Sequence, residues 1–82
     1  MPYFVYILRS LKDNKYYIGS TLDVDARLRF HNNGLQRSTR NRVPFELVYT
    51  EELSDKKEAL KRENKIKSYK GGEAFKKLLI GK

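Results

Sequence analysis

The sequence predicts a single α+β domain over residues 1–82, with a three-stranded antiparallel sheet flanked by helices in the order β-β-α-β-α-α. Three short segments have the apolar alternation of strands. They are interleaved with segments whose apolar residues recur at helical spacing. Because the chain has 82 residues and no cysteine, it has room for one small core and no disulfide to reinforce it.

The first strand, Tyr3–Arg9, is apolar on both alternating faces, which is typical of a central strand covered on two sides. A turn around Asp13 and Asn14 leads into "YYIGST", which predicts an antiparallel hairpin. The third strand, Phe45–Leu53, is expected to carry two alternating sets of side chains on opposite faces. These sets are Phe45, Leu47 and Tyr49 against Glu46, Val48 and Thr50.

Helix signals separate these strands. Asp23 is a good N-cap for a helix from Val24 to about Asn33, and Gly34 is a suitable stop. The arginine-rich segment between this helix and the third strand, residues 35–44, has no periodicity and is expected to be a loop. Ser54 is predicted to cap a long helix from Asp55 to about Tyr69. Its apolar face is expected to be Ala59, Leu60 and Ile66, and a glycine pair separates it from a short helix, "EAFKKLLI".

Charge is the most informative property of the composition. The chain has 18 Lys and Arg against 10 Asp and Glu, a net charge of +8. Such an excess favours a polyanionic partner, most commonly nucleic acid, although a solubility charge, an anionic membrane or an acidic protein are alternatives. No apolar run is long enough to span a membrane, and with no cysteine or secretion signal we expect a cytoplasmic protein. One histidine and no cysteine exclude a His/Cys zinc site and a Cys-His nucleophile.

Several polar residues occupy positions where apolar ones are expected. Val24, Leu28 and His31 have the spacing of a buried helical stripe, and Arg27 falls within the same arc. Burying a guanidinium and an imidazole costs free energy unless each finds a partner or ligand. Two interpretations stay open: either the pair serves a site, or both side chains extend outward from the edge of the stripe.

Glu63 is a similar anomaly on the long helix, where it lies among apolar residues with Lys56, Lys67 and Lys70 on the same side. One interpretation is an ordinary i, i+4 ion pair between Glu63 and Lys67. The other is an inward-facing carboxylate that binds a hydrated divalent cation.

Two tyrosines, Tyr6 on the central strand and Tyr17 on its hairpin partner, are expected on one face of the sheet. A phenol can hold water or a phosphate oxygen, or take part in proton transfer. Gly19 shares the face of Tyr17, so we expect the surface to stay open there and the strand to end in a hollow rimmed by hydroxyls.

These residues match a known pattern. "FVY" at Phe4–Tyr6 and "YIG" at Tyr17–Gly19 resemble the paired motif of the GIY-YIG nuclease superfamily. Arg27 follows ten residues after Tyr17, His31 one helical turn later, and Glu63 in the downstream helix, all in the family's order. The resemblance covers nearly the whole chain and is greatest to the small stand-alone bacterial proteins of this superfamily.

The resemblance implies a three-stranded sheet with helices that cleaves a phosphodiester with one divalent metal ion. Glu63 would hold Mg²⁺ or Mn²⁺, and Arg27 would bind the scissile phosphate. Tyr6 would accept or relay the proton of the attacking water, Tyr17 would orient the phosphate and the nucleophile, and His31 would be a further proton carrier or phosphate ligand. Which of these three residues is the general base stays open.

The sequence departs from the family pattern at Phe4, where the first motif has glycine, and at Ser20, where some relatives carry lysine. A late asparagine found in several members also has no counterpart. We expect further contacts to the nucleic-acid backbone from Ser20, Thr21, Arg37, Arg40, Arg42, Lys67 and Lys70.

The sequence therefore predicts a monomeric, metal-dependent endonuclease acting on DNA with low sequence specificity. A nucleic-acid-binding module with weak or lost catalysis is the main alternative. A basic protein in which Arg27 and Glu63 are structural partners is the third.

Overall fold

The computed structural model describes residues 1–80. Its elements are β1 (Tyr3–Ser10), β2 (Tyr16–Thr21), α1 (Val24–Asn32), the 3-10 turn η1 (Arg40–Arg42), β3 (Phe45–Leu53), α2 (Lys56–Lys67) and α3 (Glu73–Ile80). The strands form one antiparallel sheet in the order β2-β1-β3. The fold class, the element order and the central position of the first strand are confirmed. The predicted domain runs to residue 82, and its last two positions lie outside the described residues.

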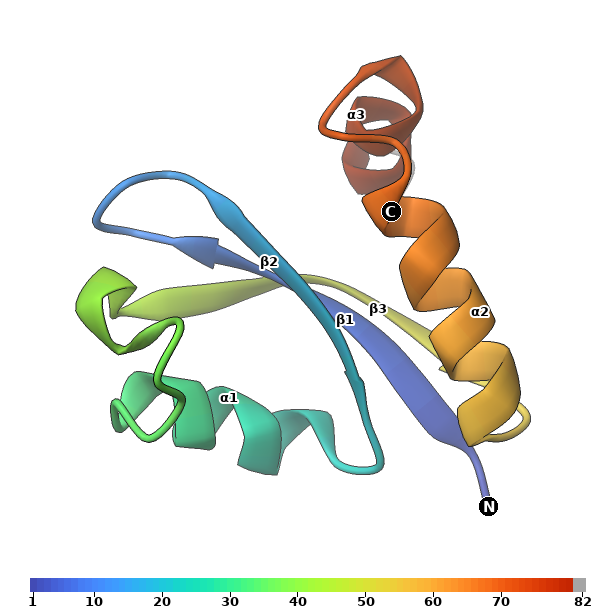
Figure 1. Cartoon of the computed structure of the whole chain (residues 1–82), viewed down its shortest axis with the longest axis horizontal. Helices are drawn as coiled ribbons and strands as arrows, with labels where there is room; N and C mark the ends of the chain where they lie inside the picture. Colours follow the sequence, from blue (N-terminus) through green and yellow to red (C-terminus); the bar gives the residue numbers. More distant parts are fainter. Residues whose placement is uncertain (81–82) are drawn as a thin grey trace.

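The sheet separates two apolar clusters, with α1 on one side and α2 on the other (Figure 1). Successive side chains of a strand point to opposite faces. Val5 and Ile7 therefore pack toward α2 and α3, in a cluster with Ala59, Ile66 and Phe75. Tyr6 and Leu8 point the other way, in a cluster with Phe45, Val24 and Leu28. Both faces of the central strand are covered, as its continuous apolar run predicts. No helix among residues 1–80 is long and apolar enough to cross a membrane.

An irregularity in β3 makes one sequence prediction wrong. Ile7 lies opposite Tyr49, but its neighbour Leu8 lies opposite Leu47, so the register shifts at Val48. A bulge of this kind inserts one extra residue and reverses the alternation beyond it. Leu47 and Tyr49 therefore do not share a face: Tyr49 packs against the α2 cluster, and Leu47 lines a pocket beside α1.

The local signals that begin and end α1 are confirmed. The turn expected around Asp13 and Asn14 is also present, in the hairpin before α1: Asn14 has a φ of 63°, and its N–H donates to the Ser10 carbonyl at 2.9 Å. The Asp23 carboxylate accepts from the Ala26 N–H at 3.0 Å, which caps the helix. Gly34 follows the helix with a φ of +74°, a conformation that glycine adopts without a Cβ clash.

Two expectations for α2 are wrong in detail. Its N-cap is Asp55, whose carboxylate accepts from the Glu58 N–H at 2.9 Å, so the cap lies one residue after Ser54. Leu60 is 43% exposed, because the row facing the sheet passes through Ala59, Glu63 and Ile66 at the i, i+4, i+7 spacing. Glu63 thus lies on the inner side of the helix, between two fully buried residues.

Candidate active site

The register of the β1–β2 hairpin brings the two tyrosines together. Leu8 lies opposite Tyr17 and Tyr6 lies opposite Gly19, so both phenols lie on the α1 face of the sheet. Their ring centroids are 6.3 Å apart. The expectation that they share a face is confirmed.

Gly19 does not leave an open hollow, and that expectation is wrong. The Tyr6 phenol lies directly over Gly19, which is itself buried. A Cβ placed on Gly19 would stand 2.6 Å from the Tyr6 hydroxyl oxygen and 2.8 Å from its Cζ, closer than van der Waals contact allows. The missing side chain is therefore needed for space, since it lets the Tyr6 ring cross over β2, an edge strand of the sheet.

His31 is a buried partner of Tyr6 rather than an outward-facing side chain. The imidazole is 1% exposed, and its Nε2 lies 3.1 Å from the Tyr6 hydroxyl. Its Nδ1 lies 2.9 Å from the hydroxyl of Thr39, which is fully buried. Burial, and then the nearby charge of Arg27, lower the pKa of His31, so the ring is neutral near pH 7.

Arg27 has the features of an anion-binding group. It is partly buried, and its guanidinium lies 5.0 Å from the centroid of the Phe30 ring. It lines a pocket of about 280 Å³ together with Thr21, Asp23, Ala26 and Phe30. Within residues 1–80 no carboxylate forms an ion pair with it. The pocket therefore offers a cation whose charge is not neutralised by the described part of the chain.

Glu63 reaches the same strand from the opposite face of the sheet. Its side chain is 13% exposed, and Oε1 accepts from the Ser20 hydroxyl at 2.8 Å. Its Oε2 pairs with Lys67 Nζ at 2.7 Å. The ion pair expected from the i, i+4 spacing is therefore present. Because Ser20 is the neighbour of Gly19, the carboxylate lies beside the point where Tyr6 crosses β2.

The pKa of Tyr6 is perturbed by its burial and by the charged groups around it. Burial raises the pKa of Tyr6 most, followed by the neighbouring Tyr17. The charge of Arg27 acts in the opposite direction, and the carboxylate of Glu63 raises the pKa again. The geometry places these groups along consecutive residues of β2. Tyr6 lies over Gly19, Glu63 accepts from Ser20, and Arg27 lines a pocket with Thr21.

A hard divalent cation is compatible with the donors at Glu63. Mg²⁺ prefers oxygen ligands and commonly keeps several waters, so one carboxylate can be its main protein ligand. The Ser20 hydroxyl supplies a second oxygen next to the carboxylate. Lys67, whose side chain is 50% exposed, would have to leave Glu63 for the cation to bind. No cluster of three or more His, Cys, Asp or Glu suited to a metal occurs within residues 1–80.

The structure places the expected backbone-contacting residues in two groups. The first group lies at the site: Ser20 is bonded to Glu63, and Thr21 is buried in a turn with Asp23 while lining the Arg27 pocket. Lys67 pairs with Glu63. Lys70 is exposed just beyond the end of α2, and no side-chain hydrogen bond or ion pair within residues 1–80 ties it to the site.

The second group is the arginine-rich loop between α1 and β3. Arg37 and Arg40 are exposed. Arg42 instead forms an ion pair with Asp13 at 3.1 Å, and its guanidinium lies 5.5 Å from the Phe45 ring centroid. Arg42 therefore ties the loop to the β1–β2 hairpin, and the two other arginines are the ones free to contact a partner.

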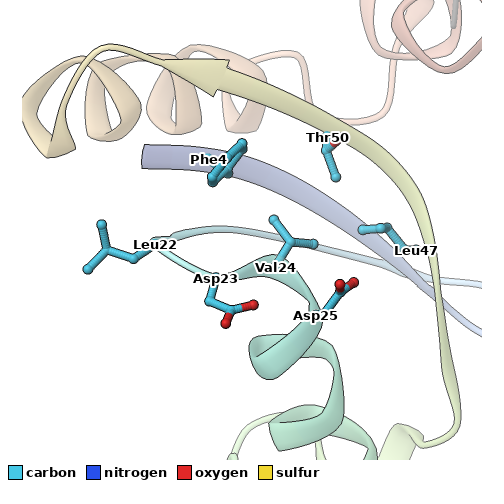
Figure 2. A pocket seen from close by; sticks show the side chains of 7 residues that line it. All are labelled: Phe4, Leu22, Asp23, Val24, Asp25, Leu47 and Thr50. Carbon is cyan, nitrogen blue, oxygen red and sulfur yellow. The ribbon is translucent and has the colours of Figure 1, made fainter. Parts of the chain in front are cut away.

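Sequence reasoning missed two features. Thr39 carries no recognisable signal, because its contact with His31 depends on the path of the loop. A second pocket, of about 450 Å³, lies beside the start of α1; Figure 2 shows Val24 of α1 and Thr50 of β3 pointing toward each other across it. Its lining residues are Phe4, Leu22, Asp23, Val24, Asp25, Leu47 and Thr50, none of them predicted as a site residue.

Comparison with known proteins agrees with this arrangement. The family described as the GIY-YIG catalytic domain matches residues 2–76. The UPF0213 protein SERP0126 of Staphylococcus epidermidis is 48% identical over 68 residues, which are 82% of each chain. The UPF0213 protein SH2523 of Staphylococcus haemolyticus is 44% identical over 68 residues, again 82% of each chain. The solution NMR structure of the UPF0213 protein BH0048 from Bacillus halodurans is 38% identical, with a TM-score of 0.55, and the match covers 99% of this chain and 84% of that one.

The family match extends over most of the chain, and the alignments to the two Staphylococcus relatives cover 82% of each chain. The motif residues Tyr6, Tyr17 and Gly19 lie together in the structure. Glu63 contacts Ser20 and Arg27 lines a pocket with Thr21, the two residues that follow Gly19. The chain therefore belongs to the GIY-YIG nuclease family.

Proposed function

We propose that this protein is a divalent-metal-dependent nuclease that hydrolyses phosphodiester bonds in DNA with little sequence preference. The observation that carries the proposal is the convergence at the edge of β2. There the Tyr6 phenol lies over Gly19, the Glu63 carboxylate accepts from Ser20, and the unpaired guanidinium of Arg27 lines a pocket with Thr21. A phosphodiester needs a positive group for its oxygens and an activated water in line with the leaving group, and this edge offers partners for both.

Glu63 and Ser20 would hold the cation, as Mg²⁺ or Mn²⁺. A cation held there would supply Lewis-acid polarisation of the phosphate. Glu63 is well suited to keep a fixed position, because it lies between Ala59 and Ile66 on the buried side of α2 and is 13% exposed. Lys67, released from Glu63, would then face the substrate as a point charge for a phosphate.

Arg27 would bind the scissile phosphate. Its pocket opens between Thr21 at the end of β2 and Phe30 on α1. The Phe30 ring restricts the guanidinium, which lies 5.0 Å from the ring centroid, and so limits the conformational entropy lost on binding. A planar guanidinium can donate two parallel hydrogen bonds to phosphate oxygens.

Tyr17 is the better candidate for the general base. The Tyr6 hydroxyl is hydrogen-bonded to His31, and burial raises its pKa, so losing its proton is unfavourable. Tyr17 is only partly buried, and no hydrogen bond holds its hydroxyl within residues 1–80. Its ring lies 4.7 Å from the His31 ring and 6.3 Å from the Tyr6 ring, which fix its orientation. In this assignment Tyr17 takes the proton of the attacking water, and Tyr6 with His31 positions the reacting groups.

Low sequence specificity follows from the kinds of contact available. Lys56 lies seven residues before Glu63, and Lys67 lies four residues after it, so the three residues form one row on α2. The exposed Arg37 and Arg40 extend the positive surface from the loop. Such residues bind the DNA backbone and carry little base information.

A nucleic-acid-binding module without catalysis is the second candidate, and one observation favours it. The Glu63 carboxylate is already engaged by Lys67 and Ser20, at 2.7 and 2.8 Å. If that network persists when DNA and metal are present, the charge of the acid is not available for a cation.

Nicking of a supercoiled plasmid in Mg²⁺, Mn²⁺ or EDTA separates these candidates. We expect nicking that requires metal and that falls at least about 100-fold in Glu63→Gln and Tyr17→Phe. Glu58→Gln is the matched control, because Glu58 is an exposed acid on the same helix that pairs with Lys61. Binding measured by fluorescence anisotropy, with no nicking in any metal, would favour the binding module. Absence of both activities would refute both candidates.

A further inference from the structure

Both nitrogens of the His31 ring have buried partners, and one of these partners has no place in the proposed chemistry so far. Nε2 faces the Tyr6 hydroxyl at 3.1 Å, and Nδ1 faces the Thr39 hydroxyl at 2.9 Å. Tyr6 is 3% exposed, His31 is 1% exposed and Thr39 is fully buried. The three side chains form a continuous polar chain from the loop to the edge of β2, closed to solvent along its length.

The position of Thr39 favours one direction for these hydrogen bonds. Its hydroxyl oxygen lies 3.5 Å from the carbonyl oxygen of Gln36, which can only accept. If the Thr39 proton points to that carbonyl, Thr39 must accept from Nδ1–H of His31. The neutral ring then has its lone pair on Nε2, and Tyr6 must donate to it.

We propose that Thr39 is a positioning residue that acts through His31 on Tyr6. By accepting from Nδ1–H it fixes the imidazole in one tautomer and turns the hydroxyl proton of Tyr6 toward Nε2. The lone pairs of the Tyr6 oxygen are thereby left as acceptors for a donor that reaches the edge of β2 during the reaction. This assignment deepens the proposed nuclease function and rests on it for its effect on catalysis.

Thr39 also connects the hydrogen bonds of His31 and Tyr6 to the exposed arginines of the loop. It immediately precedes η1, and its N–H donates to the Gln36 carbonyl at 3.1 Å, as does the Arg40 N–H at 2.9 Å. The turn that places Arg37 and Arg40 on the surface is therefore the turn that places the Thr39 hydroxyl against His31.

The tautomer is directly measurable, because His31 is the only histidine in the chain. A long-range ¹H–¹⁵N spectrum of the intact protein near pH 7 should show Nδ1 protonated and Nε2 unprotonated in wild type and in Thr39→Ser. Thr39→Val keeps the shape of the side chain but removes the acceptor, so we expect the tautomer to shift toward Nε2–H. Thr50→Val is the matched control and should leave His31 unchanged.

An Nε2–H tautomer in the wild type, or an unchanged tautomer in a folded Thr39→Val, would overturn the proposal. The wild-type spectrum decides the matter even if Thr39→Val fails to fold. In the nicking assay we expect Thr39→Val to lower kcat about 10-fold or more with little change in KM, because a small misplacement of a reacting group slows the chemical step. Thr39→Ser should restore most of this loss. A wild type without nuclease activity would refute the proposed function and leave the spectroscopic result standing.

Discussion

Replacing Gly19 with alanine should be the most damaging single-methyl change in the site. The new Cβ would lie 2.6 Å from the Tyr6 hydroxyl oxygen and 3.1 Å from its Cε1. Tyr6 cannot simply rotate away, because it is 3% exposed and bonded to the buried His31. The backbone is not the cause of the strain, since Gly19 is not among the glycines with positive φ.

The expected size of the effect combines three terms. Overpacking a buried site costs about 1–3 kcal/mol. Loss of the Tyr6–His31 hydrogen bond would add about 1 kcal/mol. Replacing glycine stabilises through the unfolded chain by roughly 0.4–1 kcal/mol, which offsets part of this. The net loss should be about 1–3.6 kcal/mol, or a fall of about 1–3.6 M in the urea midpoint for a small protein with an m-value near 1 kcal/mol/M.

Urea unfolding followed by circular dichroism measures this loss, and a double-mutant cycle assigns its cause. Tyr6→Phe removes the oxygen that makes the shortest contact, so Gly19→Ala should cost at least about 1 kcal/mol less in that background. Ser20→Ala serves as a control, because it changes the neighbouring residue on the other face and removes only the hydrogen bond to Glu63. A Gly19→Ala protein as stable as wild type would refute the steric argument. The same cost in both backgrounds would show that the Tyr6 hydroxyl is not part of the clash and that the ring carbons, 2.8 and 3.1 Å from the new Cβ, account for it.

Three further predictions concern the titrating groups. The pKa of Tyr6 in the folded protein is raised above 10.0, so its contribution to stability should be present below about pH 10 and be lost as the pH rises further. Above about pH 10 the urea midpoint should therefore fall less in Tyr6→Phe than in wild type. The pKa of His31 in the folded protein is lowered below 6.5, so the protein should lose stability as the pH falls below 6.5. A His31 NMR titration with a midpoint above 6.5 would contradict this. Glu63→Gln should change the metal-free urea midpoint little, since an i, i+4 pair contributes about 0.3–0.5 kcal/mol and the amide can still accept from Ser20.

Local sequence signals were sufficient for the elements that form the frame of the site. The cap at Asp23, the stop at Gly34 and the apolar run of β1 depend on near neighbours in the chain, and all three are confirmed. The exchange of Ser54 for Asp55 as the cap of α2 shows the limit of this reasoning. Ser and Asp side chains can both accept a capping hydrogen bond from a backbone N–H, and only the path of the chain decides which of the two residues does so.

Features that depend on contacts distant in sequence were not predictable in the same way. The bulge at Val48 reverses the faces of Leu47 and Tyr49, and no residue type marks it. Thr39 meets His31 across a loop without periodicity. The anomalous positions of His31 and Glu63 could be found from the helical pattern, but their partners could not, because a pattern fixes a direction and not what lies there.

The site depends on side-chain alternation along the four residues from Tyr17 to Ser20. Tyr17 and Gly19 point to the α1 face, where the phenol of Tyr6 crosses β2 in the space that Gly19 leaves. Ser20 points to the α2 face, where its hydroxyl meets Glu63. A strand alternates with a period of two, so adjacent residues must face opposite sides. An edge strand is the one place in a sheet where groups from both faces can act on one substrate atom, because no neighbouring strand closes it. A shift of this hairpin by one residue would place the glycine opposite a different side chain and turn Ser20 away from Glu63, separating the phenols from the acid.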